Sequence, residues 1–371
     1  MVDETPETRS DKAWSVVTSW IGRITAVVGL CATIGGGLTW LITHHRQHQQ
    51  RAAQLALAEA QATQGDYQAS LDSYAALLRS DPLDHAALDG QLNTAMLWAE
   101  NYHIAVPEGQ SATEPAGRQL DEMMSVLESG LTRTKGTRTA DVQAHLGWAH
   151  WLNQHIAARE FGPAAEQNLR AALATDPNNV YAHGMLGNWM LQNGGDFDEA
   201  IQHFNRAVAT GKALPLVRGL QLGALIDDEQ PGARREVMKV ANAMRTHGEP
   251  IDRGERHRIF GFCCAFLRDH KELVESLSAL PAQDAWQTYL WLEDPGSDLS
   301  GSQALLRTLT HDYVQAMLLE ISGNRSEALR QYRIVQQKLR QQLREPGTSL
   351  DDAVNAAIMC SSWTIPLISK W

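Results

Sequence analysis

The sequence predicts an all-α protein in which antiparallel helix pairs are stacked behind one membrane-spanning helix. Near the N-terminus, about twenty consecutive residues carry no charge, and further along the chain short helical segments repeat one spacing of small and large side chains. The composition, 43% hydrophobic and 20% charged residues, is that of a folded chain. The formal charge of −11 argues against a nucleic-acid partner, because such a partner requires a basic face to contact its phosphates.

Residues 14–43 are expected to form a transmembrane anchor. The segment from Ile24 to Thr43 has no charged residue, and Trp20 and Trp40 lie near its two ends. A helix crosses the bilayer core with roughly 20 apolar residues, and tryptophan prefers the interface between water and lipid. A cleaved signal peptide is the alternative, but the apolar core is too long and no A-x-A-like site follows it. We therefore expect a single-pass membrane protein, with the lipid bilayer as one partner.

Small residues in this segment indicate a packing surface for a second membrane helix. Gly29, Thr33 and Gly37 are four residues apart, and Ala32 and Gly36 form a second row. Such rows let two helix backbones approach closely in lipid. This pattern predicts a homo-oligomer or a complex with another membrane helix; the alternative is that glycine is simply tolerated there.

The side of the membrane that holds the downstream domain is not fixed by the sequence. Three basic residues precede the uncharged segment Ile24–Thr43 and two follow it, which favours an N-terminus inside. The downstream domain contains Cys263, Cys264 and Cys360 with no motif that pairs them, which favours a reducing compartment. We expect the cytoplasmic side for this domain, and the extracytoplasmic side stays open.

Four downstream stretches share a helical pattern: residues 65–82, 161–179, 194–211 and 322–335. In each, a small residue is followed four positions later by a large one and three positions after that by a small or apolar one. This spacing keeps all three side chains on one face of a helix. The four series are Ser70, Tyr74, Leu77; Ala165, Leu169, Ala172; Ala200, Phe204, Ala207; and Ala328, Tyr332, Val335.

The preceding helices complete the pattern. Leu146-Gly147 and Leu186-Gly187 stand in the helices before the second and third copies, and a glycine there lets the paired helix pack closely. The chain resembles the tetratricopeptide repeat family, whose units of about 34 residues form two antiparallel helices. The resemblance implies an α-solenoid, because a single helix pair cannot bury its apolar face alone.

The resemblance also implies a peptide-binding groove on the concave side, lined by the first helix of each pair. Aromatic and polar side chains on those helices are then the groove candidates, with the alternative that the tryptophans fill the core between helices. The candidates are Trp148, Trp151, His155, Asn188, Trp189 and Gln192.

The expected organisation follows the chain from tail to cap. It comprises a polar tail (1–13), the anchor (14–43), a juxtamembrane helix with the first repeat unit (44–104), a loop and helix connection (105–140), two tandem units (141–211), degenerate helical repeats (212–312), and a last unit with a C-terminal cap (313–371). A loop rich in proline, glycine and serine is expected over residues 106–117.

Motifs for catalysis or for cofactor or metal binding are not found. The sequence has no GxxxxGK[ST] loop, no HExxH and no GxSxG, so we expect no enzyme activity, no cofactor and no metal. The alternative is an enzyme or ligand-binding protein with a site in residues 212–312, where His257, Cys263, Cys264 and His270 lie close in sequence.

The function predicted from these features is that of a membrane-anchored scaffold. Its repeats would recruit or assemble other proteins at the membrane, where confinement raises the effective concentration of the partners. The alternative within the same class is a structural subunit of a membrane protein complex.

Overall fold

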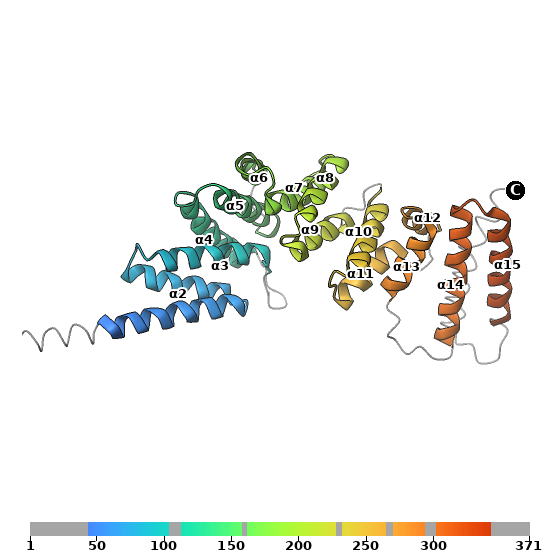
Figure 1. The fold of residues 1–371 in the computed structure, drawn as a ribbon, viewed down its shortest axis with the longest axis horizontal. Helices are drawn as coiled ribbons and strands as arrows, with labels where there is room; N and C mark the ends of the chain where they lie inside the picture. The colour runs from blue at the N-terminus through green and yellow to red at the C-terminus, as the bar shows by residue number, and fades with distance from the viewer. Residues whose placement is uncertain are drawn as a thin grey trace, which may run out of the picture. The chain divides into compact units, whose positions relative to one another are not determined.

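The computed structural model describes residues 44–103, 113–157, 162–227, 232–264, 270–293 and 302–342. Within these ranges the chain forms helices joined by short connections and contains no strand (Figure 1), which confirms the predicted all-α class for this part of the protein. No helix of the described ranges combines the length and the apolar character needed to cross a membrane. The predicted anchor, with its small residues Gly29, Ala32, Thr33, Gly36 and Gly37, and the expected C-terminal cap beyond residue 342 lie outside them.

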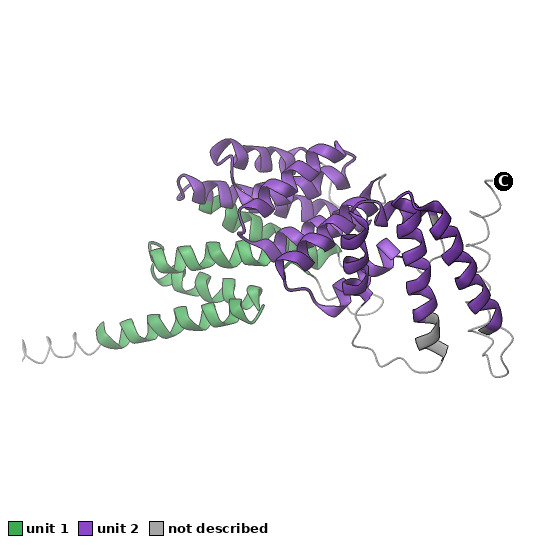
Figure 2. Cartoon of the chain, turned by 45° about the vertical axis from the view of Figure 1, so that its right-hand side comes forward, with its two compact units in different colours: residues 1–130 green, residues 131–371 purple. Residues whose placement is uncertain are grey.

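The chain divides into two compact units, Met1–Gly130 and Leu131–Trp371 (Figure 2). In the first unit, a helix over residues 44–63 precedes three further helices. These are α2 (Tyr67–Ser80), α3 (His85–Glu100) and α4 (Thr113–Leu131), the last of which ends one residue beyond the unit boundary.

The first unit begins with an antiparallel helix pair whose core contains the predicted face of α2. Tyr74 and Leu77 form a buried cluster with Ala58 of the preceding helix and Ala87 of α3. Ser70, which is fully buried, donates a hydrogen bond to the Ala58 carbonyl at 2.8 Å. This bond satisfies the hydroxyl, and so the serine fits a position that takes alanine in the other copies.

An ion pair joins the first helix to the start of α3. Asp84 is the N-cap of α3, and its side chain accepts a bond from the Ala87 N–H. The same carboxylate accepts two bonds from Arg51, at 2.5 and 2.6 Å. The Arg51 hydrogen bond holds the pKa of Asp84 down at about 2.

Helix α4 begins earlier in the sequence than expected. We predicted a loop over residues 106–117, but α4 already begins at Thr113. Pro115 lies in its first turn, where a proline is tolerated because the N–H it lacks would have no partner within the helix. Ala116 and Gly117 then face inward and are buried.

The second unit continues with helix pairs to residue 342. Its helices are α5 (Thr137–Ile156), α6 (Ala164–Thr175), α7 (Val180–Gln192), α8 (Phe197–Ala209), α9 (Leu214–Asp227), α10 (Ala233–His247), α11 (Arg253–Cys264), α12 (His270–Leu277), α13 (Ala282–Glu293), α14 (Ser302–Ile321) and α15 (Arg325–Gln342).

The tandem pairs α5/α6 and α7/α8 have the predicted packing. Ala165, Leu169 and Ala172 of α6 are fully buried, and so are their counterparts on α8. Gly147 of α5 lies so close to α6 that a Cβ there would be 2.9 Å from the Ala165 carbonyl oxygen and 2.9 Å from the Leu169 Cγ. The equivalent Gly187 of α7 lies against Ala200 and Phe204 in the same way.

First helices pack on first helices along this part of the unit. α7 contacts α5 on one side and α9 on the other. The Asn179 side chain, which caps α7, donates a 2.7 Å bond to Asp141 near the start of α5. Further along, α14 and α15 form another pair, in which Ala328 and Val335 are buried as the repeat pattern predicts.

Candidate partner-binding face and a buried polar network

Three of the predicted groove residues form a column of rings along α5. The Trp148 and Trp151 rings stack with centroids 4.4 Å apart, and the Trp151 and His155 rings stack at 4.3 Å. Trp148 is buried, Trp151 is half-buried and His155 is exposed. The column therefore runs from the packed interior to the surface. The indole N–H of Trp151 has no acceptor among the described residues.

The other three predicted residues lie on α7, which packs against α5. Asn188 is buried, and its side-chain amide donates a 3.1 Å bond to the Leu220 carbonyl of α9. Trp189 and Gln192 are half-buried. The six residues are thus on two neighbouring first helices; Asn188 links α7 to α9, and the partly exposed residues are those that a partner can reach.

Two histidines that the sequence analysis did not single out are buried together between α7 and α8. His183 Nε2 lies 2.9 Å from the Pro177 carbonyl, and its Nδ1 lies 2.7 Å from Nδ1 of His203. If His183 donates to the carbonyl, its Nδ1 accepts from His203, and both rings are neutral. Burial lowers the pKa of His183 and brings that of His203 down to about 4.

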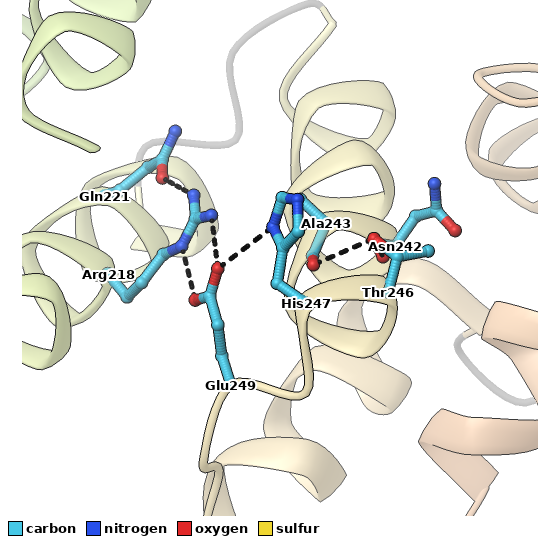
Figure 3. A network of polar contacts seen from close by, with 7 residues as sticks. All are labelled: Arg218, Gln221, Asn242, Ala243, Thr246, His247 and Glu249. Carbon is cyan, nitrogen blue, oxygen red and sulfur yellow. Dashed lines mark hydrogen bonds and ion pairs between the residues drawn. The ribbon is translucent and has the colours of Figure 1, made fainter. Parts of the chain in front are cut away.

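A buried ion pair joins α9 to the turn after α10 (Figure 3). Arg218 donates two bonds of 2.9 Å to the Glu249 carboxylate and one of 2.9 Å to the Gln221 side chain. Both charged side chains are only 8% exposed. The Arg218 hydrogen bond lowers the pKa of Glu249, so the carboxylate stays charged beside its guanidinium.

The backbone that positions Glu249 is a left-handed helix end. Gly248 adopts φ +65°, which a glycine reaches without steric cost. The Glu249 N–H then bonds to the Met244 carbonyl at 2.9 Å and closes the end of α10. This turn brings the Glu249 side chain to Arg218, as Figure 3 shows.

The thiols of the alternative enzyme site are buried in helix packing. Cys263 and Cys264 are 1% and 4% exposed, and burial raises the pKa of Cys263 to about 12 and that of Cys264 well above its ordinary value. His257 is exposed, and the His270 side chain lies outside the described residues. A thiol must ionise to act as a nucleophile or metal ligand, and the burial of these two disfavours the ionised form. In the described part of the chain, no three His, Cys, Asp or Glu residues are grouped as a metal site would require.

Sequence reasoning missed the Arg218–Glu249 pair and the histidine pair. One signal was present in each case. Arg218 is the only charged residue in the stretch LPLVRGLQLGAL, where Gln221 is the one other polar side chain, and it therefore needs a buried partner. His183 lies one residue before Gly184 on a helix with apolar residues on nearly every side. Neither signal identifies the partner, because the partner is 20 or more residues away.

The fold and the packing of these helices define an α-helical repeat protein. The sequence model of the tetratricopeptide repeat family matches residues 43–88 and 157–215. The first match contains the helix 44–63 and α2, and the second contains α6, α7 and α8. The chain is thus similar to tetratricopeptide repeats over one segment of each unit. No curated protein matches it.

Proposed function

We propose that the protein is a membrane-anchored scaffold whose repeats recruit protein partners, without catalysis. Tetratricopeptide repeats are a fold of protein–protein interaction, and that class is supported by the family matches. The observation that carries the finer proposal is the ring column of α5, which leads from buried Trp148 to half-buried Trp151 and exposed His155.

The α5–α7 face, defined by Trp151, His155, Trp189 and Gln192, has the chemistry of an anchor point for a partner. Large rings that are held in place by neighbours lose little conformational freedom on binding. The Trp151 Nε1 atom is itself buried and has no acceptor among the described residues, so a partner would contact the exposed part of the half-buried ring. His155 would add contact area at the rim.

Partner recruitment is tested by crosslinking and pull-down from detergent extracts with the full chain. The variants Trp151→Ala and Trp189→Ala are compared with Ile334→Ala, which removes another partly exposed apolar side chain, on α15. The proposal predicts that the two tryptophan variants lose the proteins that the wild-type chain captures and that Ile334→Ala keeps them. Equal capture by all variants would contradict it.

Anchoring is tested by carbonate extraction of membranes. Lysines at Leu30 and Ile34 cost roughly 3 kcal/mol each at the centre of a membrane helix. The double variant is therefore expected in the soluble fraction and the wild-type chain in the pellet. Leu83→Lys is the matched control, because Leu83 is 78% exposed in a turn; it should stay in the pellet.

The second candidate is a structural subunit of a membrane complex, which the small residues at positions 29, 33 and 37 favour. The substitutions Gly29→Leu and Gly37→Leu would then break the complex while Trp151→Ala leaves it intact. The scaffold proposal predicts the reverse order of effects.

A further inference from the structure

The second unit contains a cleft of about 390 Å³ between α9 and α11, separate from the α5–α7 face. Its walls are residues of α9, of the last turn of α10 and the segment that follows it, and of α11. The Arg218–Glu249 pair forms part of its lining. The lining consists of Leu214, Pro215, Arg218, Gly219, Leu222, Met244, Glu249, Pro250, Ile251, Asp252, Glu255 and Arg258. Half of these are aliphatic or proline side chains, and none is aromatic.

The cleft is open where α9 lacks a side chain. A Cβ at Gly219 would meet no atom within 4 Å. Glycine in the middle of a helix is less favourable than alanine. Gly219 therefore makes α9 less stable than alanine would, and its missing side chain leaves space in the cleft. On either side of it, Pro215 and Leu222 contribute apolar walls.

The lining of the cleft contains one more carboxylate than it contains arginine side chains. Arg218 is paired with Glu249, and Arg258 donates two bonds, of 2.9 and 3.0 Å, to Glu255. Asp252 accepts a 2.8 Å bond from the Glu255 N–H but forms no ion pair with any described residue. Asp227, which is not part of the lining, lies 3.8 Å from Arg258 and forms a second ion pair with it.

The Arg218 guanidinium has donors to spare. It carries five N–H groups, and the described residues accept from three of them. Because Glu249 neutralises its charge, Arg218 does not call for an anionic ligand. A neutral acceptor, such as the carbonyl of a peptide bond, suits the remaining N–H groups.

We propose that this cleft binds an extended segment of a partner protein that inserts an aliphatic side chain beside Gly219 and places a lysine or arginine against Asp252. The inference rests on the proposed function, because it adds a second contact point for a recruited protein. The aliphatic lining selects leucine, isoleucine or methionine. The excess carboxylate selects a basic residue next to it.

The test uses the full chain in detergent and a positional-scanning library of fluorescein-labelled hexapeptides built from Leu, Ile, Met, Ser, Lys, Arg, Asp and Glu. Fluorescence anisotropy should rank peptides with an aliphatic residue beside Lys or Arg first. Gly219→Leu fills the cleft and should weaken binding of these peptides at least tenfold. The matched control is Gly223→Leu, one turn further along α9, where a Cβ also meets no atom within 4 Å but which is outside the lining.

Charge recognition has its own variant. Asp252→Asn keeps a side chain that caps α11 but removes the excess charge. It should weaken the binding of the basic peptides three- to tenfold and make that binding less dependent on the salt concentration. Circular dichroism checks that both α9 variants stay folded, which is expected because leucine favours a helix more than glycine does.

The results separate this inference from the proposed function. Binding that is unchanged in Gly219→Leu, or a library ranking led by acidic or serine-only peptides, would overturn the cleft proposal and leave the α5–α7 face untouched. Unchanged partner capture by Trp151→Ala and Trp189→Ala would overturn the proposed function, whatever the peptides do.

Discussion

Replacement of Gly147 by alanine tests the close packing of the helix pairs most sharply. The new Cβ would lie 2.9 Å from the Ala165 carbonyl oxygen, 2.9 Å from Leu169 Cγ and 3.1 Å from the Leu169 nitrogen. Two of these three atoms belong to the backbone of α6, which cannot rotate away as a side chain can. The helices must therefore move apart by several tenths of an ångström.

The magnitude follows from two opposing effects. Overpacking of a core costs about 1–3 kcal/mol, and the better helix propensity of alanine returns about 1 kcal/mol. We expect Gly147→Ala to lower the free energy of unfolding by up to about 2 kcal/mol, the difference between these two effects. Gly223→Ala has no neighbour within 4 Å of its Cβ and should raise it by about 0.5–1 kcal/mol.

The assay is urea unfolding of the full chain in detergent, followed by far-ultraviolet circular dichroism. Repeat arrays are stabilised by neighbouring units and need not unfold in one step, so hydrogen exchange at the α5 and α6 amides locates the change. We expect the free energy of unfolding to fall in Gly147→Ala and to rise in Gly223→Ala. If both variants raise stability, α5 and α6 do not pack as described.

The remaining predictions concern charged groups. The pKa of His203 is about 4 in the folded protein, against 6.5 in a free histidine. As pH falls, the unfolded chain therefore takes up the proton first, and the free energy of unfolding falls by about 2 kcal/mol between pH 7 and pH 5. His203→Gln should flatten this part of a curve of stability against pH. Asp84→Asn keeps a side chain that can cap the helix but removes the carboxylate charge that pairs with Arg51 through both oxygens. It should therefore lower the thermal midpoint at pH 7 and remove the stability loss that occurs as pH falls from about 4 towards about 2. Glu249→Ala leaves the buried Arg218 charge without its carboxylate and should lower the free energy of unfolding in urea by about 3–5 kcal/mol. The double variant with Arg218→Met should recover much of this stability. No recovery would mean that the unpaired Arg218 charge is not the cause of the loss.

The repeat pattern predicted the cores of the helix pairs because it depends on local spacing alone. Ala165, Leu169 and Ala172 are fully buried, as their four-then-three spacing on α6 requires. The glycine of the partner helix could also be predicted, because a small residue at a fixed place in each pair lets the two helices pack closely. Such regularities are short-range, and a single sequence displays them directly.

Features that depend on residues distant in sequence could not be predicted from the sequence. A separate, local ambiguity explains the prediction of a loop up to Gly117 where α4 already begins at Thr113: proline is as compatible with a first helical turn as with a loop. Arg218 signals a buried partner, but the residue that supplies it lies beyond a helix and a left-handed turn at Gly248. The half-buried state of Trp151 beside buried Trp148 likewise depends on the packing of α5 and is not set by residue type.

Site-specific photo-crosslinking in intact membranes tests the central claim most directly. A photoreactive phenylalanine analogue is placed at Trp189 on the α5–α7 face or, as a control, at exposed Arg330 on α15, in the wild-type chain and in the Leu30→Lys, Ile34→Lys variant. A membrane-anchored recruiting scaffold predicts a discrete crosslinked protein at position 189 alone, and a weaker product once the chain leaves the membrane. The same products at both positions, or yields indifferent to the anchor, would contradict it.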